Sequence, residues 1–522
     1  MSDRKLIKST GIIGSATAAS RVLGFVRDIL FARIFGTGMA AQAFIVAFRI
    51  PNMLRDMIGE GATNAAIVPI LSEYQHTRTR EEYWEGARVI FNLMVMALGV
   101  ITVCGIVFAP VIVRIVAPGF LQDTEKFLLT VSLTRMVFPY IFLLGLVAYS
   151  KGVLNSLNFF VTPAIAPVVL NITMILSLYF LCRTMGVRGL VFGVISGGIF
   201  QVLLQIPPLA ARGFRLGLGK GFNLAHPLAK RIGKLLLPRA VGSAVYQLSV
   251  LVDTVLASLA WIVGAGGVAA LHFATRLVHL PLAIFGIALA TAVLPRMSRE
   301  MAHGNTDKLK HTVLFSLKTV WAVMIPSAVG LAMLADPIVR TIFQGGRFTA
   351  YSTGITSGAL FYYALGLFAY AGIKILVNTY YSMGDTRTPV KTAAVSLTIN
   401  IVLNLILMWP LKIAGLALAT AIAASVNFVM LYILLAKRIG DVGTKTLMAS
   451  FARVGGASAV MAVFILFAGR TLLRPQGIGD ERNILGLVIT VLVGICVYFI
   501  AAYIVKVESV RRLWAFVVSK TR

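Results

Sequence analysis

The sequence predicts an all-α polytopic membrane protein with about fourteen transmembrane helices, arranged as two six-helix lobes followed by two extra C-terminal helices. Three observations lead to this fold class. Of the 522 residues, 58% are hydrophobic and only 13% are charged, which is typical of a chain that lies mostly in a bilayer. Apolar runs recur along the whole chain, and the first six recur in the next six.

The individual spans follow from the length that a helix needs to cross the hydrocarbon core, about 20 apolar residues. The polar sequence between such runs is too short for a soluble domain. By this criterion the spans lie near residues 11–34, 39–72, 87–117, 127–155, 160–182, 188–210, 235–262, 267–294, 312–335, 353–382, 388–410, 412–436, 449–469 and 484–506.

The net charge of +29 would suit a nucleic-acid-binding protein, but its distribution indicates membrane topology instead. With the N-terminus inside, alternate loops carry roughly 30 Lys and Arg on the cytoplasmic side and roughly 9 on the other side. No nucleic-acid partner is therefore expected, and both termini are expected in the cytoplasm. The basic loop at 212–234 is expected to contact anionic headgroups of membrane lipids.

An internal repeat organises the spans, because five groups of residues recur in order at an offset of roughly 226 positions. The matches pair Ala47–Ile50 with Ala274–Leu277, Ile67–Pro69 with Val293–Pro295, Pro110–Arg114 and Gly119 with Pro337–Arg340 and Gly345, Gly145–Tyr149 with Gly366–Tyr370, and Thr162–Pro163 with Thr388–Pro389.

The repeat also sets the expected domains and the expected motion. Each copy has an even number of spans, so the two copies insert the same way up, related by an axis along the membrane normal. This predicts an N-lobe over 1–225, a C-lobe over 226–440, and an addition over 441–522 that contains the last two spans. A cavity between two such lobes favours transport by alternating access.

Positive charges inside the predicted spans need a specific reason. An Arg at the centre of a spanning helix costs roughly 2.5–3.5 kcal/mol to insert, so it normally faces a polar cavity or a partner. About nine cations lie in the spans, namely Arg21, Arg27, Arg33, Arg49, Arg55, Arg114, Arg135, Arg276 and Lys374. We interpret part of this set as the substrate-binding lining of one anion-attracting cavity: Arg21, Arg27, Arg49, Arg55, Arg276 and Lys374.

A second interpretation stays open, in which a guanidinium near a helix end reaches the headgroups or an acid neutralises it. Asp28 can pair with Arg21 or with Arg27, but one acid cannot neutralise both. Reaching the headgroups is the default interpretation for cations close to the span ends, such as Arg33, Arg114 and Arg135.

The predicted cavity is asymmetric in charge. Arg49 and Arg276 are equivalent in the repeat, whereas Gln247 and Leu282 stand near the positions equivalent to Arg21 and Arg55. Two histidines, His272 and His279, share a helical face with Arg276. They would sense pH if that face is luminal, and they are ordinary hydrogen-bonded packing residues otherwise.

The second span contains a candidate gate. Pro51 interrupts this helix beside Arg55, and Gly59, Glu60 and Gly61 follow within two turns. Since a proline removes one helical hydrogen bond, this stretch is expected to act as a hinge, with a static kink as the alternative.

Four oxygen-bearing residues form a candidate cation site. Asp253 lies in the seventh predicted span, Asn400 and Asn404 lie one turn apart on the eleventh, and Thr420 lies on the twelfth. Such ligands suit a hard monovalent cation, so Na⁺ is a candidate coupling ion, and no other cofactor is expected. The alternative is ordinary interhelical hydrogen bonding.

The sequence lacks the signatures of common membrane enzymes. No phosphate-binding loop is present, and Cys104, Cys182 and Cys496 stand too far apart for a metal or disulfide spacing. A cationic cavity instead suits an anion, and the planar fork of Arg suits phosphate oxygens. The expected substrate is therefore an amphiphile whose charged head enters the lumen while its tail stays in lipid.

Five motifs carry a family resemblance: Ser20–Asp28, Phe48–Arg55, Gly59–Ala62, Phe343–Gly345 and Thr388–Lys391. Through them the chain resembles the MurJ (MviN) family of lipid II flippases, within the multidrug/oligosaccharidyl-lipid/polysaccharide exporter superfamily. The resemblance implies transport of undecaprenyl-diphosphate-linked disaccharide-pentapeptide to the outer leaflet of the bacterial cytoplasmic (inner) membrane. It also implies lipid II and the proteins of peptidoglycan synthesis as partners.

The resemblance also suggests roles for single residues. Arg21, Arg27, Arg55 and Arg276 match the essential cavity arginines of the family, Lys374 matches a functional lysine, and Glu60 matches an acid near the gate. The four candidate cation ligands look similar to a sodium site of some relatives, although Asn404 stands where an acid can occur. The family is also thought to hold the lipid tail in a groove formed with the last two spans.

Three departures from the family pattern make this lumen more positive than in such relatives. Gln42 replaces an Asp, Thr275 lacks the acid often found before the cavity Arg, and His279 replaces an acid. Coupling roles given to those acids are therefore not carried over.

Two alternative functions remain from the sequence alone. One is a related transporter of other lipid-linked oligosaccharides or of drugs, although exporters of cationic drugs should show acids in the cavity. The other is a membrane enzyme that acts on lipid diphosphates.

Overall fold

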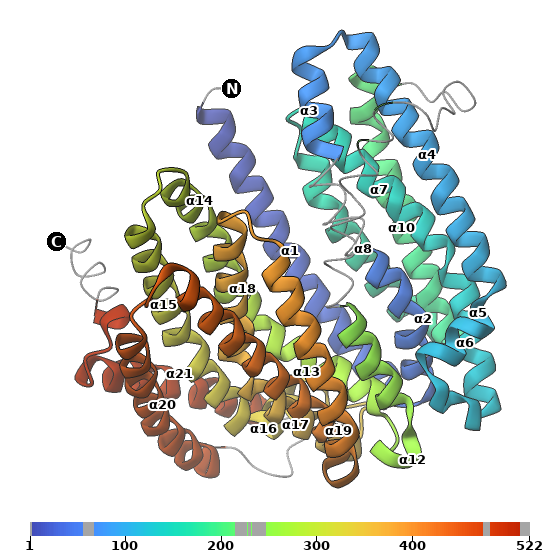
Figure 1. Cartoon of the computed structure of the whole chain (residues 1–522). Helices are drawn as coiled ribbons and strands as arrows, with labels where there is room; N and C mark the ends of the chain where they lie inside the picture. The colour runs from blue at the N-terminus through green and yellow to red at the C-terminus, as the bar shows by residue number, and fades with distance from the viewer. Residues whose placement is uncertain are drawn as a thin grey trace. The chain divides into compact units, whose positions relative to one another are not determined.

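A computed structural model describes residues 3–55, 67–214, 247–472 and 481–511, together with Pro227 and Arg231. Every regular element in these ranges is a helix, and no strand occurs among them (Figure 1). The all-α prediction is therefore confirmed.

The helices are also apolar enough to make the protein a multi-pass membrane protein. In the described ranges, nine helices are long and apolar enough to cross a membrane, or ten when the bent pair α17 (Ala350–Leu365) and α18 (Leu367–Ser382) is taken as one span. Two of the predicted spans, 39–72 and 235–262, extend beyond the described residues. The total of about fourteen spans stays a prediction.

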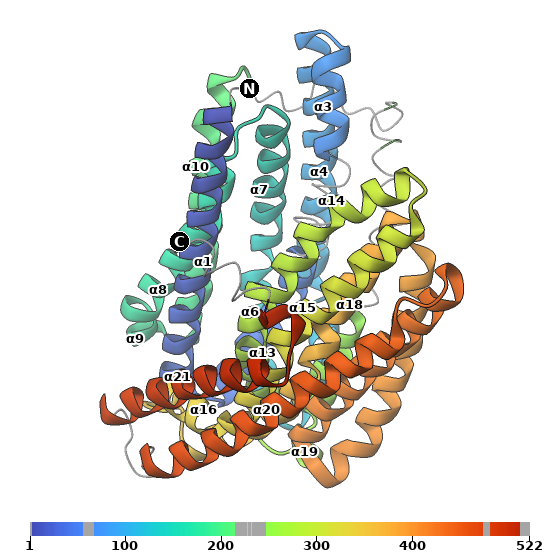
Figure 2. The same ribbon diagram turned by 90° about the vertical axis from the view of Figure 1, so that its left-hand side faces the viewer.

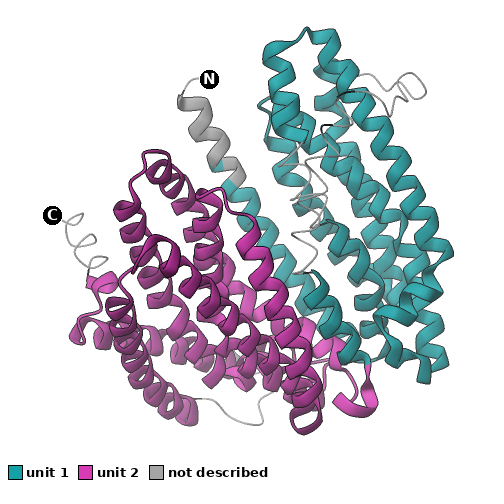
Figure 3. Ribbon diagram, viewed as in Figure 1, with its two compact units in different colours: residues 1–258 teal, residues 259–522 magenta. Residues whose placement is uncertain are grey.

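The chain divides into two compact units, Met1–Ser258 and Leu259–Arg522 (Figure 3). The predicted division into 1–225, 226–440 and 441–522 rests on the sequence repeat and stays a prediction. Unit 1 contains a helix over Gln247–Ala257 and the elements α1 (Asp3–Phe35), α2 (Met39–Arg55), α3 (Val68–Thr77), α4 (Arg80–Val107), α5 (Ala109–Val116), η2 (Pro118–Gln122), α6 (Thr124–Val137), α7 (Pro139–Ser156), α8 (Val161–Phe180), α9 (Cys182–Met185) and α10 (Val187–Ala211).

Unit 2 repeats much of this order and adds two helices at its end. Besides α17 and α18, it contains α12 (Ala260–Val263), α13 (Gly267–Pro281), η3 (Leu282–Ile287), α14 (Ala288–Ala302), α15 (Thr306–Met333), α16 (Ala335–Phe343), α19 (Arg387–Ile439), α20 (Thr444–Leu472) and α21 (Glu481–Ile504).

Helix caps reproduce the internal repeat at the offset found in the sequence. Thr79 caps α4 and Asn305 caps α15, each by accepting a backbone N–H three residues on. Asp123 and Thr349 cap α6 and α17 in the same way. Since a side-chain cap satisfies a backbone donor that the helix leaves unpaired, equivalent helices start at equivalent residues in both units.

Backbone geometry gives a second, independent sign of the repeat. Gly186 precedes α10 with a φ of 58°, and Lys412 has a φ of 53° at the equivalent position inside α19. Just beyond each, a glycine approaches a neighbouring backbone so closely that a Cβ would meet it, Gly189 at Leu181 and Gly415 at Leu407. Lys412 is also where α19 kinks, in agreement with the predicted boundary between spans 388–410 and 412–436.

In unit 1, α1 packs along α8, and α8 packs against α10 (Figures 1 and 2). A buried core joins α3, α4 and α7. There the Tyr149 hydroxyl donates to the Ala87 carbonyl over 2.7 Å, and the Tyr83 hydroxyl lies 2.8 Å from that of Ser156. These bonds satisfy buried hydroxyls and join α4 to α7.

In unit 2, α20 and α21 lie side by side, and α20 packs on α15 (Figure 2). Trp321 of α15 has its ring 5.5 Å from that of Phe428 and 5.2 Å from that of Phe451 on α20. The Tyr498 hydroxyl of α21 donates to the Ala322 carbonyl over 2.6 Å. The last two helices are therefore anchored to α15 by aromatic packing and a buried hydrogen bond.

The carboxylate of Asp385 stabilises the turn between α18 and α19. Asp385 accepts hydrogen bonds from the backbone N–H groups of Arg387 and Thr388, from the Thr388 hydroxyl and from Arg438. Burial alone would raise the pKa of this carboxyl, but the hydrogen bonds from Thr388, Arg438 and Arg387 outweigh it and lower the pKa to about 2. Asp385 thus stays charged at neutral pH.

Prolines lie inside helices of both units, and in unit 2 the helix type changes after one of them. α13 ends at Pro281 and continues into the π-helical segment η3 and then α14. Proline lacks the N–H of a regular helix, and π-helical turns are often found at functional sites. In unit 1, Pro51 is buried inside α2, whereas the predicted gate residues Gly59, Glu60 and Gly61 lie outside the described residues.

Candidate functional site

Arg27 of α1 lies at the centre of a polar cluster in unit 1. Its Nη2 and Nε contact Asp28 Oδ1 at 2.7 and 3.0 Å, and its Nη1 donates to Asn171 Oδ1 over 2.9 Å. The Arg27 side chain is only 18% exposed and that of Asp28 only 8%. Of the two pairings that the sequence left open for Asp28, the structure thus shows the one with Arg27.

Asn171 connects this cluster to the turn of α1 that contains Ser20. Its Nδ2 donates to the Ser20 carbonyl over 3.0 Å and contacts the Ser20 hydroxyl at 3.2 Å. Gly24 lies beside this amide, where a Cβ would be in ordinary van der Waals contact at 3.7 Å. Asn171 was not among the predicted site residues. It is the only amide side chain in the apolar run 160–182, and such a side chain often makes an interhelical hydrogen bond.

The other cations of unit 1 that were predicted to line the cavity lie on α1 and α2. Arg21 is exposed on α1, and Arg49 and Arg55 are half-buried on α2. Phe48, which precedes Arg49 on α2, has its ring 5.8 Å from that of Tyr140, which is fully buried on α7.

Unit 2 presents a cationic face of its own. Arg276 and His279 are exposed on α13, and Lys374 is exposed on α18. Both α13 and α18 pack against η3, so the two helices that carry these cations are neighbours in unit 2. pH sensing by His279 and by the half-buried His272 stays a prediction, as does the meeting of both units' cations in one cavity.

The candidate cation ligands take part in hydrogen bonds. Asn400 Nδ2 donates to the Thr420 hydroxyl over 3.2 Å, and Asn404 Nδ2 donates to Asn400 Oδ1 over 3.1 Å. These bonds join the two halves of α19, which corresponds to the alternative that the sequence left open. Asp253 belongs to unit 1 rather than to the unit that contains α19. Na⁺ binding stays a prediction.

One buried cation was absent from the predicted set. Lys126 of α6 is 8% exposed, donates to Gln42 Oε1 over 3.2 Å, and lies 3.9 Å from the centre of the Phe120 ring. Gln42 in turn donates to the Thr37 carbonyl over 3.1 Å. Lys126 stands at the edge of a predicted span, so neither spacing nor hydropathy marked it as buried.

In the parts of the chain that the structure describes, no group of three or more His, Cys, Asp or Glu side chains could hold a metal ion, and all three cysteines are free. Guanidinium and ammonium groups, which bind anions, lie on helices of both units.

Comparison with known proteins gives consistent matches. Residues 31–481 match the family described as lipid II flippase MurJ. A probable lipid II flippase MurJ of Rhizobium tropici is 33% identical over 527 residues, covering 97% of this chain and 96% of the relative. The lipid II flippase MurJ of Burkholderia cenocepacia is 34% identical over 463 residues, covering 88% and 89%.

Solved structures agree with the sequence matches. A lipid II flippase MurJ in an inward closed conformation superposes with a TM-score of 0.80 at 28% identity, covering 95% of this chain and 98% of that one. An inward-facing multidrug resistance MATE transporter of the MOP superfamily gives a TM-score of 0.64 over 82% of this chain and 96% of its own. At 15% identity, this second likeness shows the fold alone.

A multi-span helical protein with repeated halves and cations on apolar helices belongs to the class of membrane transporters. More narrowly, the chain belongs to the lipid II flippase MurJ family. Its class is thus that of a transporter and not of an enzyme.

Proposed function

We propose that the chain flips lipid II from the inner to the outer leaflet of the bacterial cytoplasmic membrane by alternating access, with both termini in the cytoplasm. Membership of the MurJ family over residues 31–481 is the observation that carries this proposal. The positive-inside distribution of Lys and Arg supports the orientation.

The diphosphate of lipid II is the group that the cations bind. Arg21, Arg27 and Arg55 act from unit 1, supported by Arg49, while Arg276 and Lys374 act from unit 2. Planar guanidinium groups donate two parallel hydrogen bonds to phosphate oxygens, and several cations together offset the cost of removing water from the diphosphate. The undecaprenyl tail stays in lipid during the movement of the head.

Arg27 is held in a fixed orientation before an anion binds. Because Asp28 and Asn171 already fix its orientation, little side-chain entropy is lost when it binds an anion. The side chains of Arg21, Arg276 and Lys374 are exposed and so are accessible to an incoming head.

The cycle also needs a gate and a driving force. Pro51 with Gly59, Glu60 and Gly61 forms the hinge of the second span. An inward-negative membrane potential favours inward movement of cavity cations, and so the return after the anionic cargo leaves. Na⁺ at Asp253, Asn400, Asn404 and Thr420 is the second candidate for this reset.

Lipid II binding by the purified protein tests the proposed role of the cations. Arg276→Ala should weaken binding roughly tenfold or more, because a hydrogen bond to a charged group contributes about 1.5–3 kcal/mol. Native mass spectrometry in detergent measures the bound fraction across a lipid II titration. Arg114→Ala is the matched control, since Arg114 is exposed near the end of a span. Equal affinity of all three proteins would contradict the proposal.

A further inference from the structure

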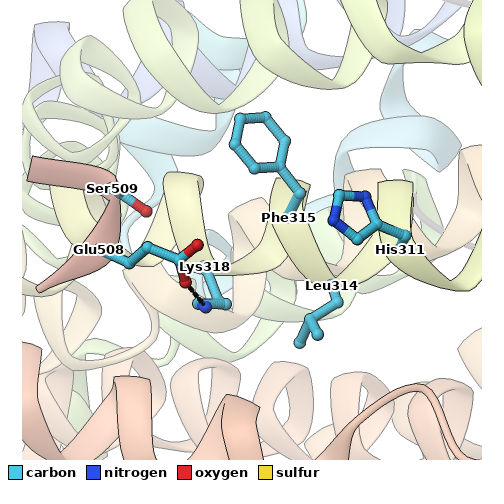
Figure 4. A pocket seen from close by; sticks show the side chains of 6 residues that line it. All are labelled: His311, Leu314, Phe315, Lys318, Glu508 and Ser509. Atoms are coloured by element: carbon cyan, nitrogen blue, oxygen red, sulfur yellow. Dashed lines mark hydrogen bonds and ion pairs between the residues drawn. The ribbon is translucent and has the colours of Figure 1, made fainter. Parts of the chain in front are cut away.

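Two cavities of unit 2 meet at one ion pair between α15 and the segment after α21. Lys318 of α15 binds Glu508, and the Lys318 side chain is only 12% exposed (Figure 4). On one side of this pair lies a small cavity of about 40 Å³ with Leu314 and Phe315 in its wall. On the other side lies a cavity of about 330 Å³ that reaches the first turns of α20.

The larger cavity carries a net positive charge. Lys318, Lys445 and Arg453 line it against the single carboxylate of Glu508. Lys445 and Arg453 lie two turns apart on α20, with the small side chain of Ala449 between them. Within the described part of the chain, neither of these two cations has an ion-pair partner, and both are exposed. Thr446 and Ser450 add hydroxyl groups to the same wall.

The helices that contribute to this basic cavity also expose apolar side chains, and Val507 lies in its wall. Met448, which precedes Ala449 on α20, is 58% exposed, and Ile504, at the end of α21, is 69% exposed. Phe315 is 36% exposed beside the Lys318–Glu508 pair. A ligand bound in the cavity by its anionic group would therefore lie on helices with exposed apolar side chains, which suits a phospholipid headgroup with its acyl chains.

From this arrangement we infer that the cavity between α15, α20 and Glu508 binds the phosphate headgroup of an anionic phospholipid. Lys445 and Arg453 contact the phosphate oxygens, and Lys318, held by Glu508, forms the inner wall. Basic pockets between transmembrane helices on the cytoplasmic side are known to bind such headgroups. The site lies entirely in unit 2 and does not depend on the cations proposed to bind lipid II.

Binding of phosphatidylglycerol to the purified full-length protein tests the inference. The double variant Lys445→Gln/Arg453→Gln should weaken phosphatidylglycerol binding about tenfold or more, because both cations at the headgroup are lost. Binding of zwitterionic phosphatidylcholine should not change. Native mass spectrometry with each lipid measures both affinities, and thermal unfolding confirms that the variant is folded.

The matched control removes two exposed cations of the same unit outside the cavity, in Lys308→Gln/Lys437→Gln. This variant should bind phosphatidylglycerol within about twofold of the wild type. Glu508→Gln should tighten binding a few-fold, because it removes the only carboxylate of the cavity. Equal loss in both double variants would mean that net charge alone attracts the lipid, and would overturn the site.

A competition experiment distinguishes a lipid headgroup from inorganic phosphate as the ligand of the cavity. Inorganic phosphate is added at constant ionic strength, with chloride as the reference salt. Inorganic phosphate competes for the same cations, but the acyl chains should let phosphatidylglycerol bind at a far lower concentration, so displacement should need a large excess of phosphate. Displacement by phosphate at a concentration equal to that of the lipid would assign the cavity to a soluble anion and contradict the lipid site.

Discussion

At the scale of the residue, Arg27 shows how a guanidinium is kept inside an apolar helix. Asp28 compensates its charge and Asn171 fixes its direction, so neither ion is left alone in a medium of low dielectric. Breaking a buried pair by removing one partner typically costs about 3–5 kcal/mol. The pair Arg27–Asp28 could be anticipated because the residues are adjacent in sequence. The partner on α8 could not, because it depends on how α1 and α8 pack.

Asn171 is predicted to act in transport through Arg27. Asn171→Ala removes the bond to Arg27 Nη1 and should slow the appearance of lipid II at the outer leaflet roughly threefold to tenfold, because the guanidinium loses its orientation. If Asn171 acts only through Arg27, Arg27→Ala/Asn171→Ala should be no slower than Arg27→Ala.

The control for this prediction is Asn92→Ala, since Asn92 is a fully buried asparagine of α4 in the same unit. This variant should transport lipid II at the wild-type rate when the variant and the wild type are present at the same level. Strictly additive losses in the double variant would show that Asn171 has a role independent of Arg27.

At the scale of the element, hydropathy predicted where helices lie better than how they are joined. The spans 388–410 and 412–436 are separated in the structure at Lys412, as the sequence indicated. The left-handed backbone of this lysine was not predicted, because glycine is the residue that normally marks such a conformation. The internal repeat could have indicated this conformation, because the residue of unit 1 that is equivalent to Lys412 is Gly186.

Lys412→Gly is predicted to stabilise the protein. Lys412 has φ 53° and ψ −129°, a region that costs a residue with a Cβ about 1–3 kcal/mol. Glycine relieves this strain but adds entropy to the unfolded chain, so a net gain of about 1 kcal/mol is expected. Thermal unfolding of the purified protein in detergent measures the change.

The reciprocal variant, Gly186→Ala, places a Cβ at φ 58° in unit 1 and should lower the unfolding temperature. Because a Cβ at Gly186 would meet no atom within 4 Å, the loss would report backbone strain rather than a clash. Lower stability of Lys412→Gly would mean that the lysine side chain contributes more than its backbone strain costs.

At the scale of the whole molecule, composition and the repeat predicted an all-helical transporter, and the motifs around Arg21 and Arg55 pointed to its family. Contacts that join distant parts of one unit were not predictable, such as Lys126 with Gln42 or Lys318 with Glu508. These contacts depend on helix packing, which hydropathy does not encode. Cations lie on apolar helices of both units. The central proposal is therefore that guanidinium groups bind the lipid diphosphate while it crosses the membrane.

The most direct test of this claim is the accessibility of lipid II in cells that rely on this chain alone. The chain is depleted, and an externally added enzyme that cleaves lipid II reports the fraction in the outer leaflet. That fraction should fall on depletion and recover with the wild type or Arg114→Ala, but not with Arg27→Ala or Arg276→Ala. An accessible fraction that stays unchanged on depletion would contradict the account.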